Sequence, residues 1–393
     1  MMTVARVPAL DRDLLTGPVR RALESESAEV RMWRCRPISY DHTDAVSGGL
    51  FRVSGTAHDH GAAVSWSLVL KVVQAQADGD DPAAAHYWKR EALAYQSSLL
   101  DDLPGGLAAP RCMGVVERPG AGAWLWLEDI ADSSPPHWPA HVYGITGRHL
   151  GLFNGAYLTA RPLPTALPLN TGWLRAYLAR NADAIARLGD DLERPLLRRV
   201  YPASVRAGIM QLWAERERFL AALDCLPQTF CHRDAWRRNL FVRALNGRDQ
   251  LVAIDWAFLG CGALGEELAP LVAASAFFGD ELAAVGELEE AAFAGYLEGL
   301  RAAGWEGEAR MVRLGYAAAV GLRYGPGVTV VIRELVRDAE RDGEQGRADT
   351  DLCDRLAGLL HLALDRADEA RDLLAGRRSH WSPPRHGHGR KAR

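Results

Sequence analysis

The part of the sequence that most constrains the fold is the stretch HRDAWRRN at residues 232–239. Two short apolar runs follow it, separated by Asn246-Gly247, a dipeptide that favours a tight two-residue turn. The sequence therefore predicts a hairpin from Leu240 to Asp255. Because a hairpin brings its two ends together, Asp255 is expected to return to the end of the strand pair at which residues 232–239 lie.

Asp234, Asn239 and Asp255 carry the side chains that phosphoryl transfer requires. A carboxylate must orient the attacking hydroxyl and accept its proton, and Asp234 is the candidate for this catalytic role. An amide oxygen and a second carboxylate must hold Mg²⁺ against the phosphates of ATP, and Asn239 and Asp255 would supply them. Each residue alone also suits a helix cap or a turn, but the complete pattern favours catalysis. His232 is interpreted as a structural hydrogen-bonding residue within the loop.

This pattern resembles that of the aminoglycoside phosphotransferase and choline kinase superfamily, whose members phosphorylate small alcohols. The resemblance extends over about residues 40–325. It implies an α+β chain with a protein-kinase-like two-lobed fold, in which a small β-rich N-lobe precedes a larger, mainly helical C-lobe, and it implies ATP and Mg²⁺ as cofactors. Glycine usually stands in this family where the chain has Arg233. Trp236 is similar to a tryptophan of the fructosamine-kinase-like branches.

The expected secondary structure agrees with two lobes. The first part is predicted to contain a short helix within residues 1–30 and a longer helix at Pro82–Leu100. Its predicted strands are Phe51–Ala57, Val64–Gln74, Cys112–Glu117 and Ala123–Leu127. The second part is predicted to be helical, with helices at Arg148–Leu158, Trp173–Leu188 and Ala203–Leu223 and again from Glu266 to about Ala375.

Three regions follow from this order of elements. Residues 1–128, with a polar lead at 1–30, are expected to form the nucleotide-binding lobe. Residues 129–376 are expected to form the helical lobe with the catalytic loop and the acceptor site. Residues 377–393 are rich in arginine and histidine and contain no acidic residue, so we expect a disordered basic tail.

Lys71 is one of only three lysines in the chain and lies inside an apolar strand. Strand alternation places Lys71 on the face opposite Trp66, Leu68 and Leu70. Such a lysine otherwise tends to lie on an edge strand or to extend its ammonium group into solvent along the apolar surface. In the resembled fold, the lysine of this strand contacts the α- and β-phosphates of the nucleotide, and the resemblance implies the same role for Lys71.

Further nucleotide-site residues are expected in the same lobe. Glu91 is the candidate carboxylate that holds Lys71, because it would share a helix face with Trp88 and Tyr95, although a solvent-exposed glutamate is the alternative. Ser47 and Gly49 occupy the place of a phosphate-covering loop, where glycine would let backbone N–H groups approach the phosphates. A plain turn fits them equally well. The backbone around Glu128, in the hinge, is expected to bind adenine.

At two positions of the C-lobe, the chain has a residue type that differs from the one common in the family. Asn154 stands where the family often has histidine, and we expect it to have a packing role. Glu267 stands where the family commonly has aspartate. It is expected to order the catalytic loop without a direct part in catalysis.

Composition excludes several classes of function. The formal net charge of −4 argues against a general nucleic-acid-binding protein. The longest apolar run is too short to span a bilayer, and charged residues at 11–13 interrupt the N-terminal region, so we expect a cytoplasmic protein without a membrane partner. The six cysteines include no C-x-x-C pair, so neither a zinc site nor a disulfide framework is predicted.

The acceptor is expected to be a small alcohol, and the charge pattern favours an amine-bearing one such as an aminoglycoside. Between Arg248 and Arg301 there is no lysine or arginine but there are ten acidic residues, which would attract a cation. A neutral sugar, a fructosamine-like acceptor and a catalytically silent nucleotide-binding scaffold are the alternatives. A protein kinase fits less well, because Asp-Trp-Ala at residues 255–257 replaces Asp-Phe-Gly.

Overall fold

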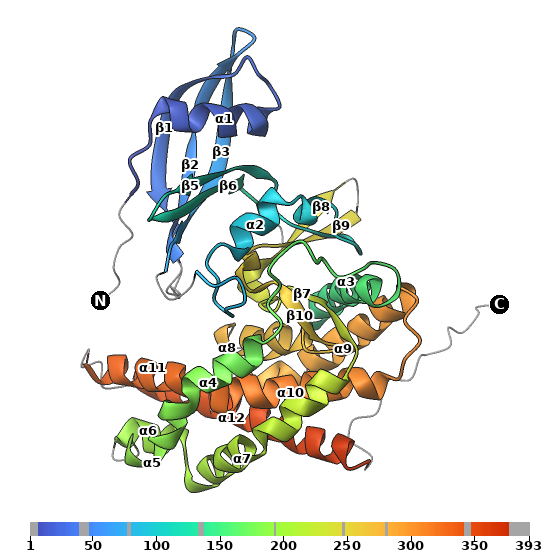
Figure 1. Cartoon of the computed structure of the whole chain (residues 1–393). Coiled ribbons are helices and arrows are strands. Elements are labelled where there is room, and N and C mark those ends of the chain that lie inside the picture. Colours follow the sequence, from blue (N-terminus) through green and yellow to red (C-terminus); the bar gives the residue numbers. More distant parts are fainter. Residues whose placement is uncertain are drawn as a thin grey trace, which may run out of the picture. The chain divides into compact units, whose positions relative to one another are not determined.

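The computed structural model describes residues 7–38, 47–76, 80–132, 137–191, 194–245, 248–279, 282–341 and 347–376. The chain groups into two compact units, each made of several segments (Figure 1). Unit 1 comprises Met1–Ser134, Pro164–Asn170 and Leu240–Leu259, and unit 2 comprises Pro135–Leu163, Thr171–Asn239 and Gly260–Arg393. The expected boundary between residues 128 and 129 stays a prediction.

Unit 1 contains a five-stranded antiparallel sheet with the strand order β1-β2-β3-β6-β5. Its strands are β1 (Glu29–Pro37), β2 (Ser47–Asp59), β3 (Ala62–Gln74), β5 (Cys112–Arg118) and β6 (Gly122–Glu128). Helix α1 (Arg12–Leu23) lies across one face of this sheet (Figure 1). Leu15 and Val19 of α1 are buried in one cluster with Phe51 and Leu68 of the sheet, so apolar burial holds the helix on the strands.

Strand β3 has the alternation that the sequence predicts. Trp66, Leu68 and Leu70 are buried in the core of unit 1. Lys71 lies on the opposite face, where it pairs across β3 with Leu50 of β2 and Leu125 of β6. Since β3 has a neighbour on each side, Lys71 is in an interior strand, and the edge-strand alternative is wrong.

The helix expected at Pro82–Leu100 is much shorter in the structure, where α2 spans Arg90–Gln96. Before α2 the backbone forms turns, in which the Ala84 carbonyl accepts from the Tyr87 N–H at 3.2 Å and from the Arg90 guanidinium at 2.6 Å. After α2, Ser98 has a φ of 60°, a left-handed conformation that does not continue a helix. The predicted length was therefore wrong at both ends.

The hairpin predicted after the catalytic stretch is confirmed. Strands β8 (Leu240–Leu245) and β9 (Arg248–Ala253) pair antiparallel, with Leu240 opposite Ala253. The short strand β4 (Leu107–Ala108) pairs parallel with β9. The Asn246-Gly247 turn lies outside the described residues. After β9, the 3₁₀ turn η4 (Trp256–Phe258) follows Asp255 directly.

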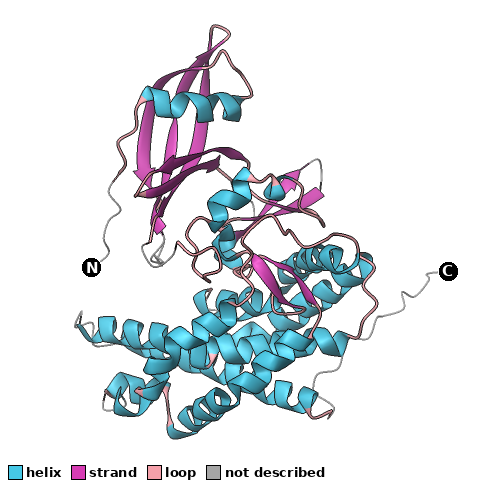
Figure 2. Ribbon diagram, viewed as in Figure 1, coloured by secondary structure: helices cyan, strands magenta, loops and turns pink. Residues whose placement is uncertain are grey.

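Unit 2 is mainly helical (Figure 2). Its α-helices are α3 (Ala140–Thr159), α4 (Trp173–Ala186), α5 (Leu188–Asp191), α6 (Pro195–Val200), α7 (Ala203–Cys225), α8 (Ser275–Phe278), α9 (Val285–Ala302), α10 (Ala309–Tyr324), α11 (Thr329–Arg341) and α12 (Arg347–Leu374). Strands β7 (Gln228–Cys231) and β10 (Gly260–Ala263) form a two-stranded antiparallel sheet. The predicted α+β class, with a β-rich first part and a helical remainder, is confirmed.

Short helical turns complete both units. They are η2 (Leu99–Asp101) in unit 1 and η3 (Arg237–Asn239), η5 (Pro270–Ala274), η6 (Leu282–Ala284) and η7 (Pro326–Val328) in unit 2. Within the described ranges, no helix is both long and apolar enough to cross a membrane. The expected disordered tail at 377–393 lies outside those ranges.

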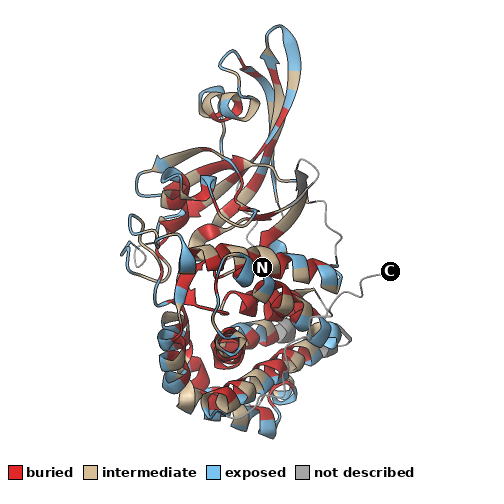
Figure 3. Cartoon of the chain, turned by 90° about the vertical axis from the view of Figure 1, so that its right-hand side faces the viewer, coloured by how far each residue is buried: buried red, intermediate tan, exposed pale blue. Residues whose placement is uncertain are grey.

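Helices α3 and α9 approach so closely that glycine is required between them. A Cβ atom at Gly151 would lie 2.1 Å from the carbonyl oxygen of Tyr296. The same contact region buries Asn154, whose amide donates to the Phe230 carbonyl at 2.8 Å and accepts a 2.6 Å hydrogen bond from the Tyr296 hydroxyl. Asn154 thus joins α3, α9 and β7, in agreement with its expected packing role. Figure 3 shows the buried residues along the helices of unit 2.

Candidate active site

Lys71, Glu91 and Asp255 form an ion cluster within unit 1. Lys71 Nζ lies 2.6 Å from Glu91 Oε2 and 2.7 Å from Asp255 Oδ1. Strand β3, helix α2 and the turn after β9 supply the three side chains. The Glu91 side chain is 2% exposed and that of Asp255 is 31% exposed. The structure therefore brings together three residues that were singled out in the sequence, and Asp255 is the carboxylate that a ligand can reach.

The electrostatics of this cluster favour a cationic ligand. Burial alone would lower the pKa of Lys71, but the carboxylates of Asp255 and Glu91 outweigh it and raise the pKa above its ordinary value. Burial also raises the pKa of Glu91, and the charge of Lys71 opposes that rise. Lys71 thus remains protonated. With both carboxylates ionised the cluster carries a net negative charge, which suits a divalent cation with oxygen ligands.

The turn at Asp255 is fixed by hydrogen bonds on its C-terminal side. Asp255 has φ 62° and ψ 66°, a left-handed conformation that costs a residue other than glycine about 1–2 kcal/mol. The next N–H, of Trp256, donates to Glu91 Oε1 at 3.1 Å. The Trp256 indole donates to the Ala253 carbonyl at 2.8 Å. Glu91 therefore holds both Lys71 and the backbone that carries Asp255.

Arg90, next to Glu91, is a residue of this site that the sequence analysis missed. Arg90 is 1% exposed, and its guanidinium donates to the carbonyls of Pro168 at 2.9 Å and Ala257 at 3.4 Å. The first turn of α2 therefore contacts the η4 turn after Asp255 through two adjacent side chains. The guanidinium also donates to the nearby carbonyls of Ala84 and Ala85, but the contacts with Pro168 and Ala257 join segments far apart in sequence, so no local pattern indicates them.

In unit 2, Asp234 and Asn239 lie side by side in the loop after β7. Asn239 Nδ2 donates to the Asp234 carbonyl at 3.0 Å and to Asp234 Oδ2 at 2.9 Å. Because both acceptors are oxygens, this amide atom must be the nitrogen. Among the described residues, no donor bonds to Asn239 Oδ1, so this oxygen can serve a metal. His232 Nδ1 accepts a 3.2 Å hydrogen bond from the Asp234 N–H, the structural role that we expected.

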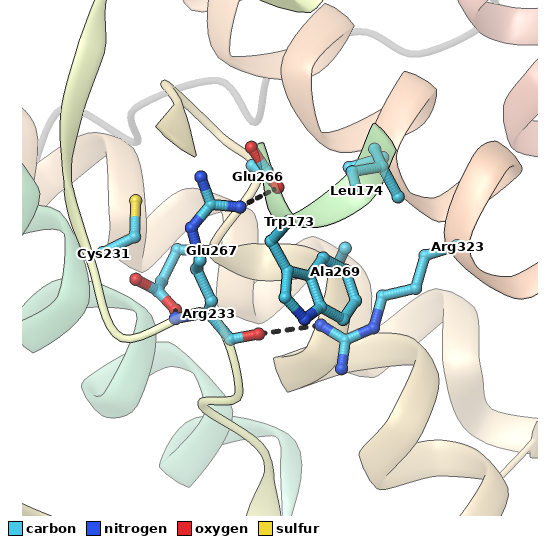
Figure 4. Close-up of a pocket in the computed structure, with 9 residues that line it drawn as sticks. Trp173, Leu174, Cys231, Arg233, Glu266, Glu267, Ala269 and Arg323 are labelled. Carbon is cyan, nitrogen blue, oxygen red and sulfur yellow. Dashed lines mark hydrogen bonds and ion pairs between the residues drawn. The ribbon is translucent and has the colours of Figure 1, made fainter. Parts of the chain in front are cut away.

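Arg233, at the position where the family usually has glycine, adopts a φ of 69°. Glycine reaches this conformation without steric cost, whereas another residue must be held in it. The Arg233 N–H donates to Glu267 Oε1 at 2.8 Å, and the Arg233 guanidinium donates to Glu266 Oε1 at 3.0 Å (Figure 4). Glu267 Oε2 also accepts from the His232 N–H at 2.7 Å, so Glu267 orders the loop.

Burial raises the pKa of Glu267, and the charge of His232 and the backbone donors oppose the rise. Two residues before Glu267, Gly265 lies directly against the backbone of α10, because a Cβ atom at Gly265 would lie 2.1 Å from the Val312 carbonyl oxygen. Gly265 also has a φ of 94°, which favours glycine.

Arg323 of α10 is the second residue that the sequence analysis missed. One of its guanidinium nitrogens donates to the Arg233 carbonyl at 2.8 Å, and another donates to Asp234 Oδ1 at 2.8 Å. The guanidinium lies 4.5 Å from the ring centre of Trp173, a cation–π contact. Figure 4 shows Arg323, Arg233 and Trp173 around the same small pocket. No sequence spacing links Arg323 to the catalytic stretch, which lies 89 positions earlier.

Ser47 and Gly49 do not form the expected loop. Both belong to β2, where Ser47 pairs with Val73 and Gly49 with Val72, and the register shifts between them. Gly49 has a φ of 126°, which favours glycine. The backbone irregularity in the strand therefore accounts for the glycine, and both the loop and the plain-turn conformations were wrong. The expected contact of Ser47 and Gly49 with the nucleotide stays a prediction.

Glu128 lies at the end of β6, as the sequence predicts. Its N–H donates to the Arg111 carbonyl at 2.9 Å, and its carboxylate accepts a 2.9 Å hydrogen bond from Arg243. Since its N–H already has this acceptor, the expected adenine contact stays a prediction for the Glu128 carbonyl or for the backbone that follows it.

The sequence of the chain matches the profile of the phosphotransferase enzyme family over residues 75–309, which is more than half of its length. The chain belongs to this family. The matched region contains Glu91, the loop at residues 232–239 and Asp255, and it begins after Lys71. Membership of the aminoglycoside phosphotransferase and choline kinase superfamily is thereby confirmed. No curated protein matches the sequence.

Solved structures share the fold. A choline kinase from Cryptosporidium parvum has a TM-score of 0.53 and 11% identity, and the match covers 92% of this chain and 97% of that one. A microcompartment-associated aminopropanol kinase has a TM-score of 0.51 and 13% identity, with 91% and 97% covered. An aminoglycoside phosphotransferase from Alicyclobacillus acidocaldarius has a TM-score of 0.51 and 13% identity, with 95% and 99% covered. The predicted kinase-like fold is confirmed. Family and fold together make the chain a small-molecule kinase with an alcohol acceptor.

Proposed function

We propose that the protein transfers the γ-phosphoryl group of ATP to a hydroxyl of a small molecule, with Mg²⁺ bound. The observation that carries the proposal is the cluster of Lys71, Glu91 and Asp255, in a chain whose catalytic loop also joins Asp234 to Asn239 by hydrogen bonds. A silent nucleotide-binding scaffold would need neither a base nor two metal ligands. The complete set therefore favours an active kinase.

Lys71 is proposed to bind the α- and β-phosphates of ATP, with Glu91 keeping its ammonium group in place. Since Glu91 is buried, its bond to Lys71 does not depend on solvent or on a ligand. Asp255 shares the same ammonium group but is partly exposed. A bound phosphate would compete with Asp255 for Lys71, and a bound cation would compete with Lys71 for Asp255. Ligand binding would therefore affect the Lys71–Asp255 contact and leave the Lys71–Glu91 contact in place.

Asn239 and Asp255 are proposed to hold Mg²⁺. Their oxygens suit this ion, which prefers carboxylate and carbonyl ligands. Strand β8 starts directly after Asn239, and its first residue pairs with Ala253, two positions before Asp255. When bound, Mg²⁺ would neutralise charge on the phosphates during transfer.

Asp234 is proposed to orient the acceptor hydroxyl. In the transfer, the acceptor oxygen bonds to the γ-phosphorus, the bond from that phosphorus to the bridging oxygen of ADP breaks, and the hydroxyl proton passes to Asp234. Catalysis would rest mainly on the positions of these groups.

The acceptor is proposed to be an amine-bearing alcohol. Choline, aminopropanol and aminoglycosides, named for the similar structures, all combine an amine or ammonium group with a hydroxyl. The acidic stretch between Arg248 and Arg301 supports the same class. A neutral sugar or a fructosamine-like compound remains the alternative acceptor.

A screen for ADP release tests this function, with ATP, Mg²⁺ and a panel of aminoglycosides, amino alcohols, sugars and nucleosides. Asp234→Asn should lower kcat by about 10²-fold or more while ATP still binds. The new amide nitrogen must face either Arg323 or Asn239, both of which are donors here, so hydrogen exchange of the loop should be measured in parallel. Turnover like that of the wild type would exclude Asp234 as the base.

A further inference from the structure

Arg323 contacts the catalytic loop at two consecutive residues. Its guanidinium donates to the Arg233 carbonyl and to Asp234 Oδ1, both at 2.8 Å. The guanidinium also lies over the ring of Trp173 and is mostly buried, with 16% of the side chain exposed. The planar fork of an arginine suits two acceptors at once, and its stacking on an aromatic ring limits the orientations it can adopt.

These contacts fix the orientation of the Asp234 carboxylate. Oδ1 accepts from Arg323, and Oδ2 accepts from Asn239. A rotation of the carboxylate would break both bonds. The direction in which Asp234 presents its lone pairs is therefore set by α10 on one side and by its own loop on the other.

The second contact holds the unusual backbone at Arg233. This residue has a left-handed φ of 69° without being glycine. Glu267 holds its N–H, Glu266 holds its guanidinium, and Arg323 holds its carbonyl. Each polar end of the residue thus has a partner on a different side chain. Without Arg323, the carbonyl that precedes Asp234 would lose its fixed direction.

We propose that Arg323 is a positioning residue for phosphoryl transfer, which fixes both the Asp234 carboxylate and the left-handed backbone at Arg233. This inference rests on the proposed function, because it assigns Arg323 a task only if Asp234 acts on the acceptor. Arg323 is predicted to affect the transfer step and to leave nucleotide binding unchanged, since Lys71 and Asp255 do not depend on it.

The test compares Arg323→Gln and Arg323→Lys with the control Arg175→Gln in the full-length protein. Arg175 also bonds two carboxylates in unit 2, Glu217 at 2.9 Å and Asp224 at 2.5 Å, but its side chain is 43% exposed. We expect Arg323→Gln to lower kcat by about 10- to 100-fold with the KM for ATP unchanged, as for a displaced reacting group. Arg323→Lys should restore kcat only in part, because an ammonium group lacks the fork.

Two further readouts separate positioning from general stability. Added guanidinium or ethylguanidinium at millimolar concentration should restore part of the kcat of Arg323→Gln. Hydrogen exchange should become faster in peptides covering the loop at residues 231–239 and should stay unchanged in the α-helices of unit 2. Neither change is expected for Arg175→Gln.

The outcomes also distinguish this inference from the proposed function. If the wild type releases no ADP with any acceptor, the proposed function fails, while the exchange measurement still tests the hold of Arg323 on the loop. The positioning role is overturned if Arg323→Gln keeps wild-type kcat and loop exchange. It is also overturned if exchange rises throughout unit 2 and guanidinium restores nothing, because Arg323 would then be a general structural residue.

Discussion

Lys71 Nζ lies 2.7 Å from Asp255 Oδ1, although the two residues are 184 positions apart in the sequence. The same ammonium group bonds the buried Glu91, so two carboxylates share one cation. A ligand that neutralises Asp255 would leave Lys71 attached to Glu91 alone. Lys71 would then have more of its charge available for phosphate oxygens. Metal and nucleotide binding are therefore expected to be coupled through this one contact.

Asp255→Ala should abolish the part of ATP binding that depends on Mg²⁺. The change removes the more exposed carboxylate of the cluster, and the remaining proposed ligand, Asn239, is neutral. We expect binding with Mg²⁺ to weaken by about tenfold or more, whereas binding without Mg²⁺ stays the same or tightens because Lys71 loses a competing partner. Calorimetry with ATP, with and without Mg²⁺, measures both parts.

Asp224→Ala is a suitable control for this experiment, because Asp224 is also a carboxylate bonded to a basic side chain but is 65% exposed and lies in unit 2. It should leave both binding constants unchanged. An undiminished Mg²⁺ effect in Asp255→Ala would mean that other residues hold the metal.

Lys71 and Asp255 could be predicted from the sequence because each lies at a conspicuous position. Lys71 is a rare lysine inside an apolar strand. Asp255 lies at the end of a hairpin that begins directly after Asn239 and turns at Asn246-Gly247. Glu91 was selected because it lies on the apolar face of a predicted helix. In each case local periodicity, together with the resemblance to the family, was enough to select the residue.

Arg90 and Arg323 could not be predicted, because their partners come from distant segments. The acceptors of Arg90 include carbonyls of Pro168 and Ala257, and Arg323 reaches a loop 89 positions earlier. Arginines on helices usually lie in solvent, so only tertiary acceptors reveal these two. The overlong helix prediction has a local cause, since periodicity does not show that the Arg90 guanidinium bonds the carbonyls of Ala84 and Ala85 before the helix.

Arg90→Lys should destabilise unit 1 by about 1–3 kcal/mol, since an ammonium group cannot reach all the carbonyls that the guanidinium bonds and at least one would stay buried without a donor. Urea unfolding measures the loss, and hydrogen exchange should become faster at residues 164–170 and 256–258. Lys89→Ala is the control, because the ion pair of Lys89 with Glu117 at 3.6 Å is partly exposed and weak. Equal unfolding free energies for Arg90→Lys and the wild type would contradict this account.

Arg313→Leu should strongly destabilise the helical unit. Arg313 is 1% exposed and bonds Glu289 at 2.5 Å and Glu369 at 2.6 Å, which ties α10 to α9 and α12. Its removal leaves two buried carboxylates with Arg366 as their nearest cation. A broken buried pair of this kind costs about 3–5 kcal/mol. Thermal and urea unfolding measure the loss.

Arg175→Leu is the matched control for this change, because it breaks two ion pairs whose side chains are all more than 40% exposed. Its cost should stay below about 1 kcal/mol. If the two variants unfold alike, burial of the Arg313 network does not contribute as proposed.

The charge argument for the acceptor changes once the acidic stretch is seen in the structure. Five of its ten acidic residues already bond a cation or backbone N–H groups within their own unit: Asp255, Glu266, Glu267, Glu289 and Glu298. Glu287 and Glu290 are exposed on α9. The negative field available to an acceptor is therefore smaller than the sequence alone predicts, so the acceptor's charge needs a direct test.

Ionic strength provides that test once the screen has identified an acceptor. Raising the salt concentration from about 0.1 M to about 1 M shortens the Debye length from roughly 10 Å to roughly 3 Å. If the acceptor is an ammonium compound drawn by this field, its KM should rise several-fold while kcat stays constant. The N-acetylated form of the same acceptor carries no charge and serves as the control, because its KM should respond little. Glu287→Gln combined with Glu290→Gln should weaken the salt response only if these exposed carboxylates supply the field. A best acceptor that is neutral would reject the amine-bearing class, and a KM that ignores salt for both forms would reject the contribution of the acidic field. Either result would leave the kinase assignment intact.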